Sequence, residues 1–304
     1  MAAATPPITE PVPRRELPDW IRVRPPHGEY GHVRELLSEL RLGSVCREAH
    51  CPNLSECWSE GTATLMLLGT DCTRRCSFCA VTTHWPRGAV DATEPARVAE
   101  AVRRWGLRYV VLTQVCRDDL PDGGAALLAE TVERIRAAVP HVRVELLIGD
   151  LGANPDALAR LLEHPPDVLA HNLETTRALS HAVRDPRAGY DRSLDVLRAA
   201  RDLGRRSQVT KSSIMLGLGE ADDELRTAFA DLRGAGVDLL TLGQYLRPSA
   251  AHRPVARYVP PEEFARWRDL ALDVGFVGVE SGPLVRSSYH AEALWRRAFE
   301  ARGG

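Results

Sequence analysis

Cysteine is the residue type whose number and spacing in this 304-residue chain point most directly to chemistry. Six of the seven cysteines lie between positions 46 and 79. In a chain without a secretion signal, thiols this closely spaced bind metal more often than they form disulfides. The six cysteines form two triplets of different spacing, Cys46-x4-Cys51-x5-Cys57 and Cys72-x3-Cys76-x2-Cys79.

Three cysteines in each group allow two interpretations. A structural zinc ion takes four tetrahedral ligands, and His50 and His84 are available as the fourth ligand of each group. A zinc-stabilised α/β binding protein is therefore one interpretation. In an iron–sulfur cube each of the four irons needs an outside ligand, so three cysteines leave one iron free to bind another molecule. Two such cubes are the other interpretation.

The second triplet resembles the cysteine motif of radical S-adenosylmethionine (SAM) enzymes. In that superfamily the motif Cys-x3-Cys-x2-Cys holds a [4Fe–4S] cluster, and the methionine part of SAM binds the open iron. Phe78, directly before the last cysteine, also matches this motif. The triplet follows the strand-like run 64–69. The loop after the first strand of a parallel β/α barrel lies at the end of the barrel that carries the active site.

Strand-like and helical segments alternate along the rest of the chain, which indicates a parallel sheet. Six such units predict an α/β fold, a partial parallel (β/α)6 barrel that is open on one side. The expected strands are 64–69, 108–113, 141–148, 167–174, 208–217 and 237–245. Helices are expected over 94–105, from Pro155, and in segments 123–139, 191–203 and 261–274.

Composition and charge exclude several classes of protein. The chain has 39 Lys and Arg against 41 Asp and Glu, with a formal net charge of -2. A balance this close to neutral argues against a broad nucleic-acid-binding surface. No run reaches the roughly 18 apolar residues that a membrane span needs, and the proline-rich start lacks the apolar core of a secretion signal. We therefore expect a soluble, cytoplasmic protein with no nucleic-acid or membrane partner.

The chain as a whole resembles the lipoyl synthase family between positions 41 and 291. Its first cysteine triplet and the sequence Arg286-Ser287-Ser288-Tyr289 are specific to that family among radical SAM enzymes. The motifs that carry the resemblance are 51–58 (CPNLSECW), 72–76 (CTRRC), 117–124 (RDDLPDGG), 170–175 (AHNLET), 216–220 (LGLGE), 243–246 (GQYL) and 281–289 (SGPLVRSSY).

This resemblance implies four segments in the chain. A proline-rich arm is expected over 1–20, and an N-terminal extension with the first triplet over 21–62. The radical SAM barrel is expected over 63–275, and a C-terminal extension with the Arg-Ser-Ser-Tyr motif over 276–304.

The resemblance also implies a reaction and its cofactors. Two [4Fe–4S] clusters and two SAM molecules per turnover are expected. The cluster on Cys72, Cys76 and Cys79 cleaves SAM to a 5′-deoxyadenosyl radical. This radical removes hydrogen from C6 and C8 of a protein-bound octanoyl-lysine, which no side-chain base is strong enough to do. Sulfur then comes from the second cluster.

In the family the second cluster is held by the first cysteine triplet and by a serine of the Arg-Ser-Ser-Tyr motif. We assign Ser288 to this role, with Ser287 as the alternative. A serine oxygen is a harder ligand than a thiolate, so the iron that it holds is the most easily lost. A cluster that loses iron easily suits a role as sulfur donor.

The expected SAM contacts lie at the ends of the strands that form the barrel mouth. They are Thr113 and Gln114 for the methionine amino group, and Asn172 and Glu174 for the ribose. Gly217 and Glu220 are assigned to adenosine, and Arg184 or Lys211, the only lysine of the chain, to the methionine carboxylate.

Three departures from the family pattern leave open a paralogue that acts on another acyl chain. Gln114-Val115-Cys116 replaces Ser-Val-Asp, the segment 80–90 follows the pattern loosely, and Glu280 replaces a small residue. Cys116 is interpreted as a small buried hydrophobic residue.

The partners implied are an octanoylated lipoyl carrier protein or domain, or the glycine cleavage H protein. A low-potential electron donor and an iron–sulfur carrier that rebuilds the second cluster are also implied. Paired arginines on helix faces are candidates for docking an acidic carrier. They are Arg103-Arg104, Arg205-Arg206 and Arg296-Arg297.

Overall fold

The computed structural model describes residues 17–23 and 25–301, so most of the proline-rich arm predicted for 1–20 lies outside it. Its centre is a sheet whose strands follow one another in chain order from β1 to β8. The strands are β1 Gly43–Ser44, β2 Thr64–Leu67, β3 Tyr109–Gln114, β4 Arg143–Leu147, β5 Val168–Ala170, β6 Val209–Leu216, β7 Leu239–Gln244 and β8 Gly278–Gly282.

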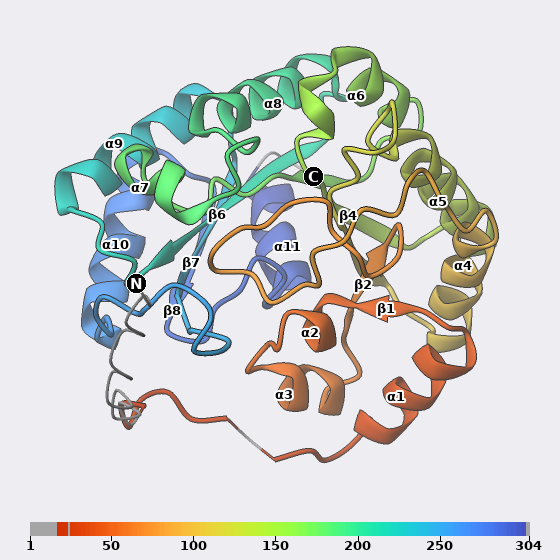
Figure 1. Cartoon of the computed structure of the whole chain (residues 1–304), viewed down its shortest axis with the longest axis horizontal. Helices are drawn as coiled ribbons and strands as arrows, with labels where there is room; N and C mark the ends of the chain where they lie inside the picture. Colours follow the sequence, from red (N-terminus) through yellow and green to blue (C-terminus); the bar gives the residue numbers. More distant parts are fainter. Residues whose placement is uncertain (1–16, 24, 302–304) are drawn as a thin grey trace, which may run out of the picture.

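Strands β2 to β8 are parallel, and the short β1 pairs antiparallel with β2. In the described part of the chain, β1 and β8 each pair with a single neighbour, so the sheet curls without closing. This arrangement confirms the predicted open parallel barrel. Figure 1 shows most of the helices arranged around the outside of this sheet, with the C-terminal helix behind its centre.

The sequence predicted six parallel strands. The described residues contain seven, because β8 was not predicted. Residues 239–243 of β7 pair with 278–282 of β8, inside the segment assigned to the C-terminal extension. Two of the five residues of β8 are glycine, which has low strand propensity, so the local pattern did not indicate a strand.

Helices connect the parallel strands, and several begin where the sequence predicts. Asn154 caps α6 by accepting hydrogen bonds from the backbone N–H groups of Asp156 and Ala157. None of the described helices is long and apolar enough to cross a membrane. The helices are α1 Tyr30–Glu39, α2 Val45–Glu48, α3 Leu54–Ser59, α4 Glu94–Trp105, α5 Ala125–Ala138, α6 Pro155–Leu161, α7 Arg177–Val183, α8 Tyr190–Leu203, α9 Asp222–Gly234, α10 Pro261–Val274 and α11 Ala291–Ala301.

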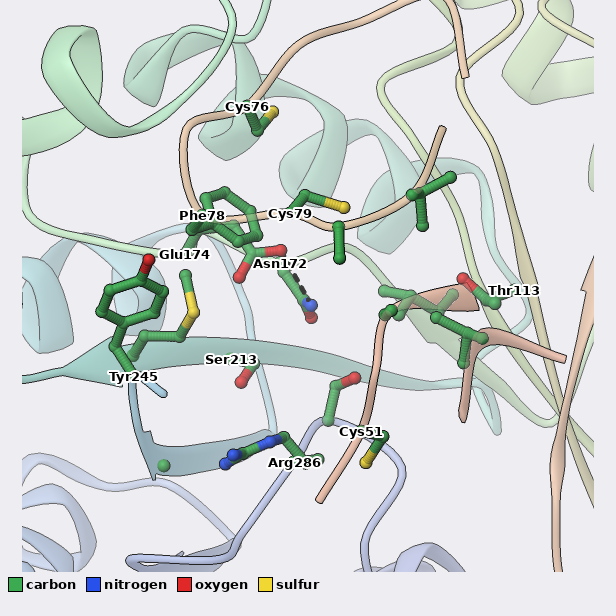
Figure 2. Close-up of a pocket in the computed structure, with 18 of the residues that line it drawn as sticks. Cys51, Cys76, Phe78, Cys79, Thr113, Asn172, Glu174, Ser213, Tyr245 and Arg286 are labelled. Carbon is green, nitrogen blue, oxygen red and sulfur yellow. Dashed lines mark hydrogen bonds between the residues drawn. The ribbon is translucent and has the colours of Figure 1, made fainter. Parts of the chain in front are cut away.

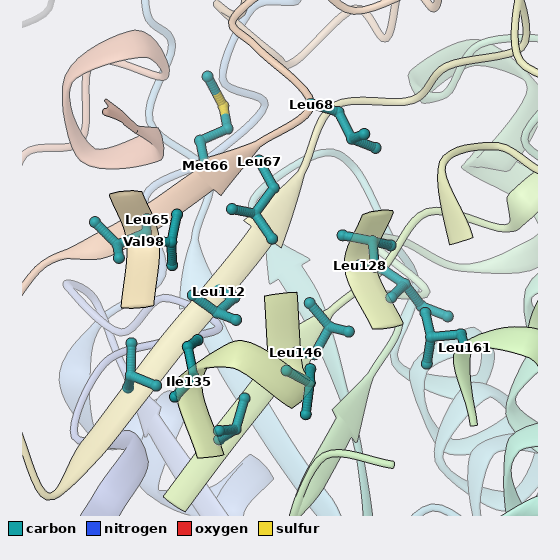
Figure 3. Packing of buried hydrophobic residues seen from close by; sticks show 14 of the residues in the cluster. Leu65, Met66, Leu67, Leu68, Val98, Leu112, Leu128, Ile135, Leu146 and Leu161 are labelled. Carbon is teal, nitrogen blue, oxygen red and sulfur yellow. The ribbon is translucent and has the colours of Figure 1, made fainter. Parts of the chain in front are cut away.

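The main apolar core lies between the sheet and the surrounding helices. Leu112 of β3 and Leu146 of β4 are fully buried together with Leu128 and Ile135 of α5, as Figure 3 shows. A smaller cluster joins Leu294 of α11 to the first residues of β5 and β7, Val168 and Leu239. Helix α11 therefore covers the N-terminal end of the barrel and leaves the C-terminal end for the functional site.

The interior of the barrel contains a buried ion pair. Lys211 Nζ lies 2.8 Å from Glu145 Oε1, and both side chains are 1% exposed. The hydroxyl of Tyr109 donates to the other oxygen of the same carboxylate at 2.7 Å. Lys211 is the third residue of β6, far from the strand's C-terminal end, so its side chain is paired inside the barrel and does not line the mouth. Its assignment to the methionine carboxylate was wrong.

Lys211→Met should lower the free energy of unfolding by about 3–5 kcal/mol, because the buried carboxylate of Glu145 loses its cation and keeps only the hydrogen bond from Tyr109. The double variant Lys211→Met/Glu145→Leu should recover most of this loss, since it leaves no buried charge. Urea unfolding followed by circular dichroism measures both effects. A single variant as stable as the wild type would contradict this account of the barrel interior.

Candidate active site at the barrel mouth

A cavity of about 560 Å³ opens at the C-terminal ends of the strands. Residues of both cysteine triplets line it, as do the loops after β2, β3, β5 and β7. In Figure 2, Cys76 and Cys79 lie above the central residues of the cavity, and Cys51 lies below them. Segments that are far apart in the sequence therefore supply thiols to a single space.

The second triplet is carried by the loop that leaves β2, as predicted. The backbone N–H of Arg74 donates to Cys72 Sγ at 3.5 Å, and that of Asp185 donates to Cys76 Sγ at 3.3 Å. Amide hydrogen bonds to cysteine sulfur stabilise thiolate charge and orient the ligand. The loop thus offers its sulfurs in an environment suited to a cluster.

Arg74 fixes this loop to the barrel. Its guanidinium lies 2.7 Å from Asp118 Oδ1 and 2.6 Å from Asp150 Oδ1, and its side chain is 3% exposed. Although burial acts in the opposite direction, the hydrogen bonds from Arg74 lower the pKa of both carboxyls, so they are ionised at neutral pH. Asp118 follows β3 and Asp150 follows β4, so one cation ties three loops together.

Arg187 adds a second connection to the same loop. It donates to the carbonyl of Thr73 at 2.6 Å and pairs with Asp185 at 2.8 Å. The carboxylate of Asp185 also accepts from the backbone N–H of Arg75 at 2.8 Å. The cysteine loop is therefore held by charged contacts from several sides.

Burial changes the acidity of several thiols at this site, and all seven cysteines are free. It raises the pKa of Cys76 to about 11 and that of Cys79 and Cys57 to about 12. Cys72 is the exception, because a hydrogen bond with Cys116 lowers its pKa to about 6. Buried thiols become thiolates when a metal supplies the compensating charge, so these donors fit an iron–sulfur cluster.

Cys116 therefore differs from the buried apolar residue that was expected. It lies on the cavity wall with its thiol against Cys72. Gly149 leaves it room, because a Cβ there would lie 3.0 Å from the Cys116 sulfur.

The first triplet lies on the segment that contains β1, α2 and α3. Cys46 and Cys51 line the cavity, and Cys57 is close enough for its charge to be coupled to theirs. Asn53, between these cysteines, donates to the carbonyl of Leu284 at 2.5 Å. This contact brings the N-terminal segment against the Arg-Ser-Ser-Tyr motif.

The motif itself reaches the cavity beside the first triplet. Ser287 and Ser288 both line the cavity wall, and the Tyr289 hydroxyl donates to Glu56 at 3.4 Å. Gly243 of β7 permits this approach, because a Cβ there would lie 2.0 Å from the Val285 carbonyl oxygen. The glycine of the GQYL motif therefore has a structural role, because it allows the backbone at Val285 to pack against β7.

Arg286 is a cavity residue that received no role of its own in the sequence analysis. Figure 2 shows its guanidinium below the centre of the cavity, and a Cβ at Gly243 of β7 would lie 3.2 Å from its Nη1. Burial lowers its pKa, whereas the charge of Cys51 acts to raise it. In the described residues it makes no ion pair with a carboxylate, and it donates to its neighbouring carbonyl, Val285 O, at 2.6 Å. The only feature of the sequence that could have pointed to Arg286 is its position as the first residue of the Arg-Ser-Ser-Tyr motif.

Two amide oxygens on the cavity wall are buried without a hydrogen-bond partner, Gln114 Oε1 and Asn172 Oδ1. A buried acceptor without a partner is costly, so each favours a ligand that donates hydrogen bonds. Asn172 also donates to Glu174 Oε1 at 3.1 Å. The structure thus places Gln114, Asn172 and Thr113, three of the residues expected to bind SAM, where they can contact a cavity ligand.

Glu174 combines two unusual features. Its φ of 70° is in the left-handed region that non-glycine residues rarely adopt, and burial raises its carboxyl pKa. Such backbone strain is concentrated at functional sites. Phe78 and Arg184 also lie on the cavity wall, as expected.

Gly217 and Glu220 do not line the cavity, so their assignment to adenosine was wrong. A Cβ at Gly217 would lie 2.5 Å from the Arg257 carbonyl oxygen, so this glycine accommodates protein backbone. The Glu220 carboxylate accepts hydrogen bonds from the N–H groups of residues 217–219 and thereby stabilises the turn after β6.

The described residues contain no preformed site of the kind that a structural zinc ion would need. Among them, no three Cys, His, Asp or Glu side chains are grouped to hold a metal ion. His84 lies 3.4 Å from Asp71, and its side chain is 63% exposed.

Comparison with known proteins shows the family to which this chain belongs. Residues 66–232 match the model of the radical SAM superfamily. The lipoyl synthase of Sorangium cellulosum is 50% identical over 94% of this chain and 81% of its own length. The lipoyl synthase of Thermus thermophilus is 53% identical over 95% of this chain and 89% of its own length. That of Pyrobaculum calidifontis is 54% identical over 92% of this chain and 96% of its own length.

The chain belongs to the lipoyl synthase family. It is a radical SAM enzyme, and the family uses SAM and two [4Fe–4S] clusters. The zinc-stabilised binding protein was therefore the wrong alternative.

Solved structures of low sequence identity support the fold. The FeFe-hydrogenase maturase HydG from Carboxydothermus hydrogenoformans is 15% identical with a TM-score of 0.57, over 88% of this chain and 60% of its own. Methylornithine synthase (PylB) is 16% identical with a TM-score of 0.50, over 91% of this chain and 93% of its own.

Arg74→Met should loosen the cysteine loop, because Asp118 and Asp150 lose their shared cation. In iron-stripped protein, alkylation of Cys72, Cys76 and Cys79 by iodoacetamide should become about tenfold faster, as local opening becomes easier. Peptide mass mapping measures the rate at each cysteine.

Arg103→Met is the control, because Arg103 forms an exposed pair with Glu100 on α4. It should leave alkylation unchanged. Equal rates in Arg74→Met and the wild type would show that Arg74 does not hold the loop.

Proposed function

We propose that this chain inserts sulfur at C6 and C8 of an octanoyl group carried on a lysine of another protein. The observation that carries the proposal is that cysteines of both triplets line one cavity, Cys46 and Cys51 from the first and all three from the second. A carbon radical formed beside one triplet lies in the same space as the sulfur source on the other. This proximity is what a transfer of sulfur to a short-lived radical requires.

Cys72, Cys76 and Cys79 hold the cluster that binds SAM in this proposal. Cys46, Cys51 and Cys57, with Ser288 or its alternative Ser287, hold the second cluster. When bound, the first cluster supplies the electron that cleaves SAM to a 5′-deoxyadenosyl radical, and the second supplies sulfur. The chain contributes the amide donors to Cys72 and Cys76, and the contacts that hold the serine motif beside Cys51.

SAM is oriented by residues on the opposite walls of the cavity. The free Gln114 oxygen and Thr113 suit the methionine ammonium, which donates hydrogen bonds. Asn172 and Glu174 suit the ribose hydroxyls, since an amide and a carboxylate can accept and donate as needed. Phe78 belongs to an apolar group with Tyr245 and lies beside these residues in Figure 2. Arg184 is the cation for the methionine carboxylate.

The substrate partner is an octanoylated lipoyl carrier protein or domain, or a glycine cleavage H protein. Several arginine pairs proposed for docking are already neutralised on outer helices. Arg103 pairs with Glu100, Arg104 with Glu39, Arg296 with Glu292 and Arg297 with Glu280. Arg205 and Arg206 form no such pair in the described structure, but they precede β6, at the end of the barrel opposite the mouth.

Turnover also needs a low-potential electron donor and an iron–sulfur carrier that rebuilds the second cluster. Six thiols that must stay reduced favour a cytoplasmic site of action.

The triple variant Cys46→Ala/Cys51→Ala/Cys57→Ala should separate the two chemical roles. With an octanoyl-lysyl peptide and reductant, it should still form 5′-deoxyadenosine but no thiolated peptide. Its iron content should fall from about eight to about four per chain. Anaerobic mass spectrometry and iron analysis measure these quantities.

Wild-type protein should give dithiolated peptide and two 5′-deoxyadenosines per product. Cys72→Ala is the matched variant, and it should form neither 5′-deoxyadenosine nor product. Wild-type protein that cleaves SAM but leaves the octanoyl peptide unmodified would favour a paralogue acting on another acyl chain. Thiolated product from the triple variant would overturn the assignment.

A further inference from the structure

Three buried side chains form a chain of hydrogen bonds beside the cavity. Arg184 Nη1 donates to Ser193 Oγ at 2.8 Å. Ser193 Oγ lies 2.8 Å from His171 Nε2, and His171 Nδ1 lies 2.9 Å from the carbonyl oxygen of Ile148. Arg184 and His171 line the cavity, whereas Ser193 lies behind them on α8.

The chemistry of these groups sets the direction of every bond. A carbonyl oxygen can only accept, so the proton of His171 must be on Nδ1. Burial lowers the pKa of His171 to about 4, which keeps the ring neutral and makes Nε2 an acceptor. The Ser193 hydroxyl must then donate its single proton to His171. Its lone pairs are left to accept from Arg184.

Arg184 is a buried cation that lacks an ion pair in the described structure. Its remaining acceptors are the carbonyl oxygens of Leu173 and Gly189, both at 3.4 Å. Residue Arg184 is 8% exposed, and the negative charge of Glu174 acts on it without a salt bridge. A buried guanidinium whose hydrogen-bond acceptors are all neutral is stabilised when an anion binds it directly. Its position on the cavity wall indicates that the anion belongs to a ligand.

The neighbouring residues indicate which part of the ligand this anion is. The backbone N–H of Asp185, the next residue, donates to Cys76 Sγ. The anion bound by Arg184 therefore lies beside the second cysteine triplet, where the methionine end of SAM binds.

We propose that His171 and Ser193 are positioning residues that hold Arg184 toward the cavity, where it binds the methionine carboxylate of SAM. This inference rests on the proposed function for the identity of the ligand. Neither residue touches SAM in this account. Both act by directing the guanidinium.

Ser193→Ala tests the inference in holoenzyme with both clusters loaded, by equilibrium binding of SAM and of decarboxylated SAM. Loss of the Ser193 acceptor should weaken SAM binding about tenfold, as expected for a hydrogen bond to a charged group. Decarboxylated SAM lacks the group that Arg184 binds, so its affinity should be the same in the variant and the wild type. His171→Leu removes the acceptor for Ser193 and should show the same selectivity.

Thr131→Ala is the control, because it removes another fully buried hydroxyl from α5, remote from the cavity. It should bind both ligands as the wild type does. Equal weakening of both ligands by Ser193→Ala, or weakening of neither, would overturn the inference. Wild-type protein that forms dithiolated peptide in either case would show that the proposed function stands and that this inference alone has failed.

Discussion

The parallel order of the strands is the constraint on which the rest of the structure depends. Because β2 to β8 run in one direction, the loops that follow them meet at one end of the barrel. One of these loops carries the second cysteine triplet, and Arg74 ties it to the ends of β3 and β4 through Asp118 and Asp150. The N-terminal segment and the serine motif then attach to the same end, through the contact between Asn53 and Leu284.

The parts of the fold and site that could be predicted are those with short-range signals. Cysteine spacing predicted two groups of thiols whose members line one cavity, and the alternation of strand-like and helical runs predicted the open parallel barrel. Residues at the ends of strands, such as Gln114 and Asn172, lie on the cavity wall because strand direction alone determines which ends meet. Their proximity to the thiols follows from topology.

The parts that sequence could not provide depend on side-chain partners from distant elements. Lys211 is an unusual residue in an arginine-rich chain, yet its partner Glu145 on β4 determines its role. Gly217 and Glu220 shape a turn. The role of Gly217 becomes visible only from the backbone of residue 257, which packs against this turn. Similarly, Ser193 became important only when its distance to Arg184 was known.

In the proposed reaction, sulfur held by the first triplet reaches an acyl chain activated at the second, because cysteines of both triplets line one cavity. The most direct measurement uses protein whose clusters are rebuilt with ³⁴S-sulfide. Reaction with an octanoyl-lysyl peptide in unlabelled buffer, followed by mass spectrometry of the product, locates the label. Both inserted sulfurs should be ³⁴S, whereas product that carries only unlabelled sulfur would show that the protein-bound clusters are not the sulfur source.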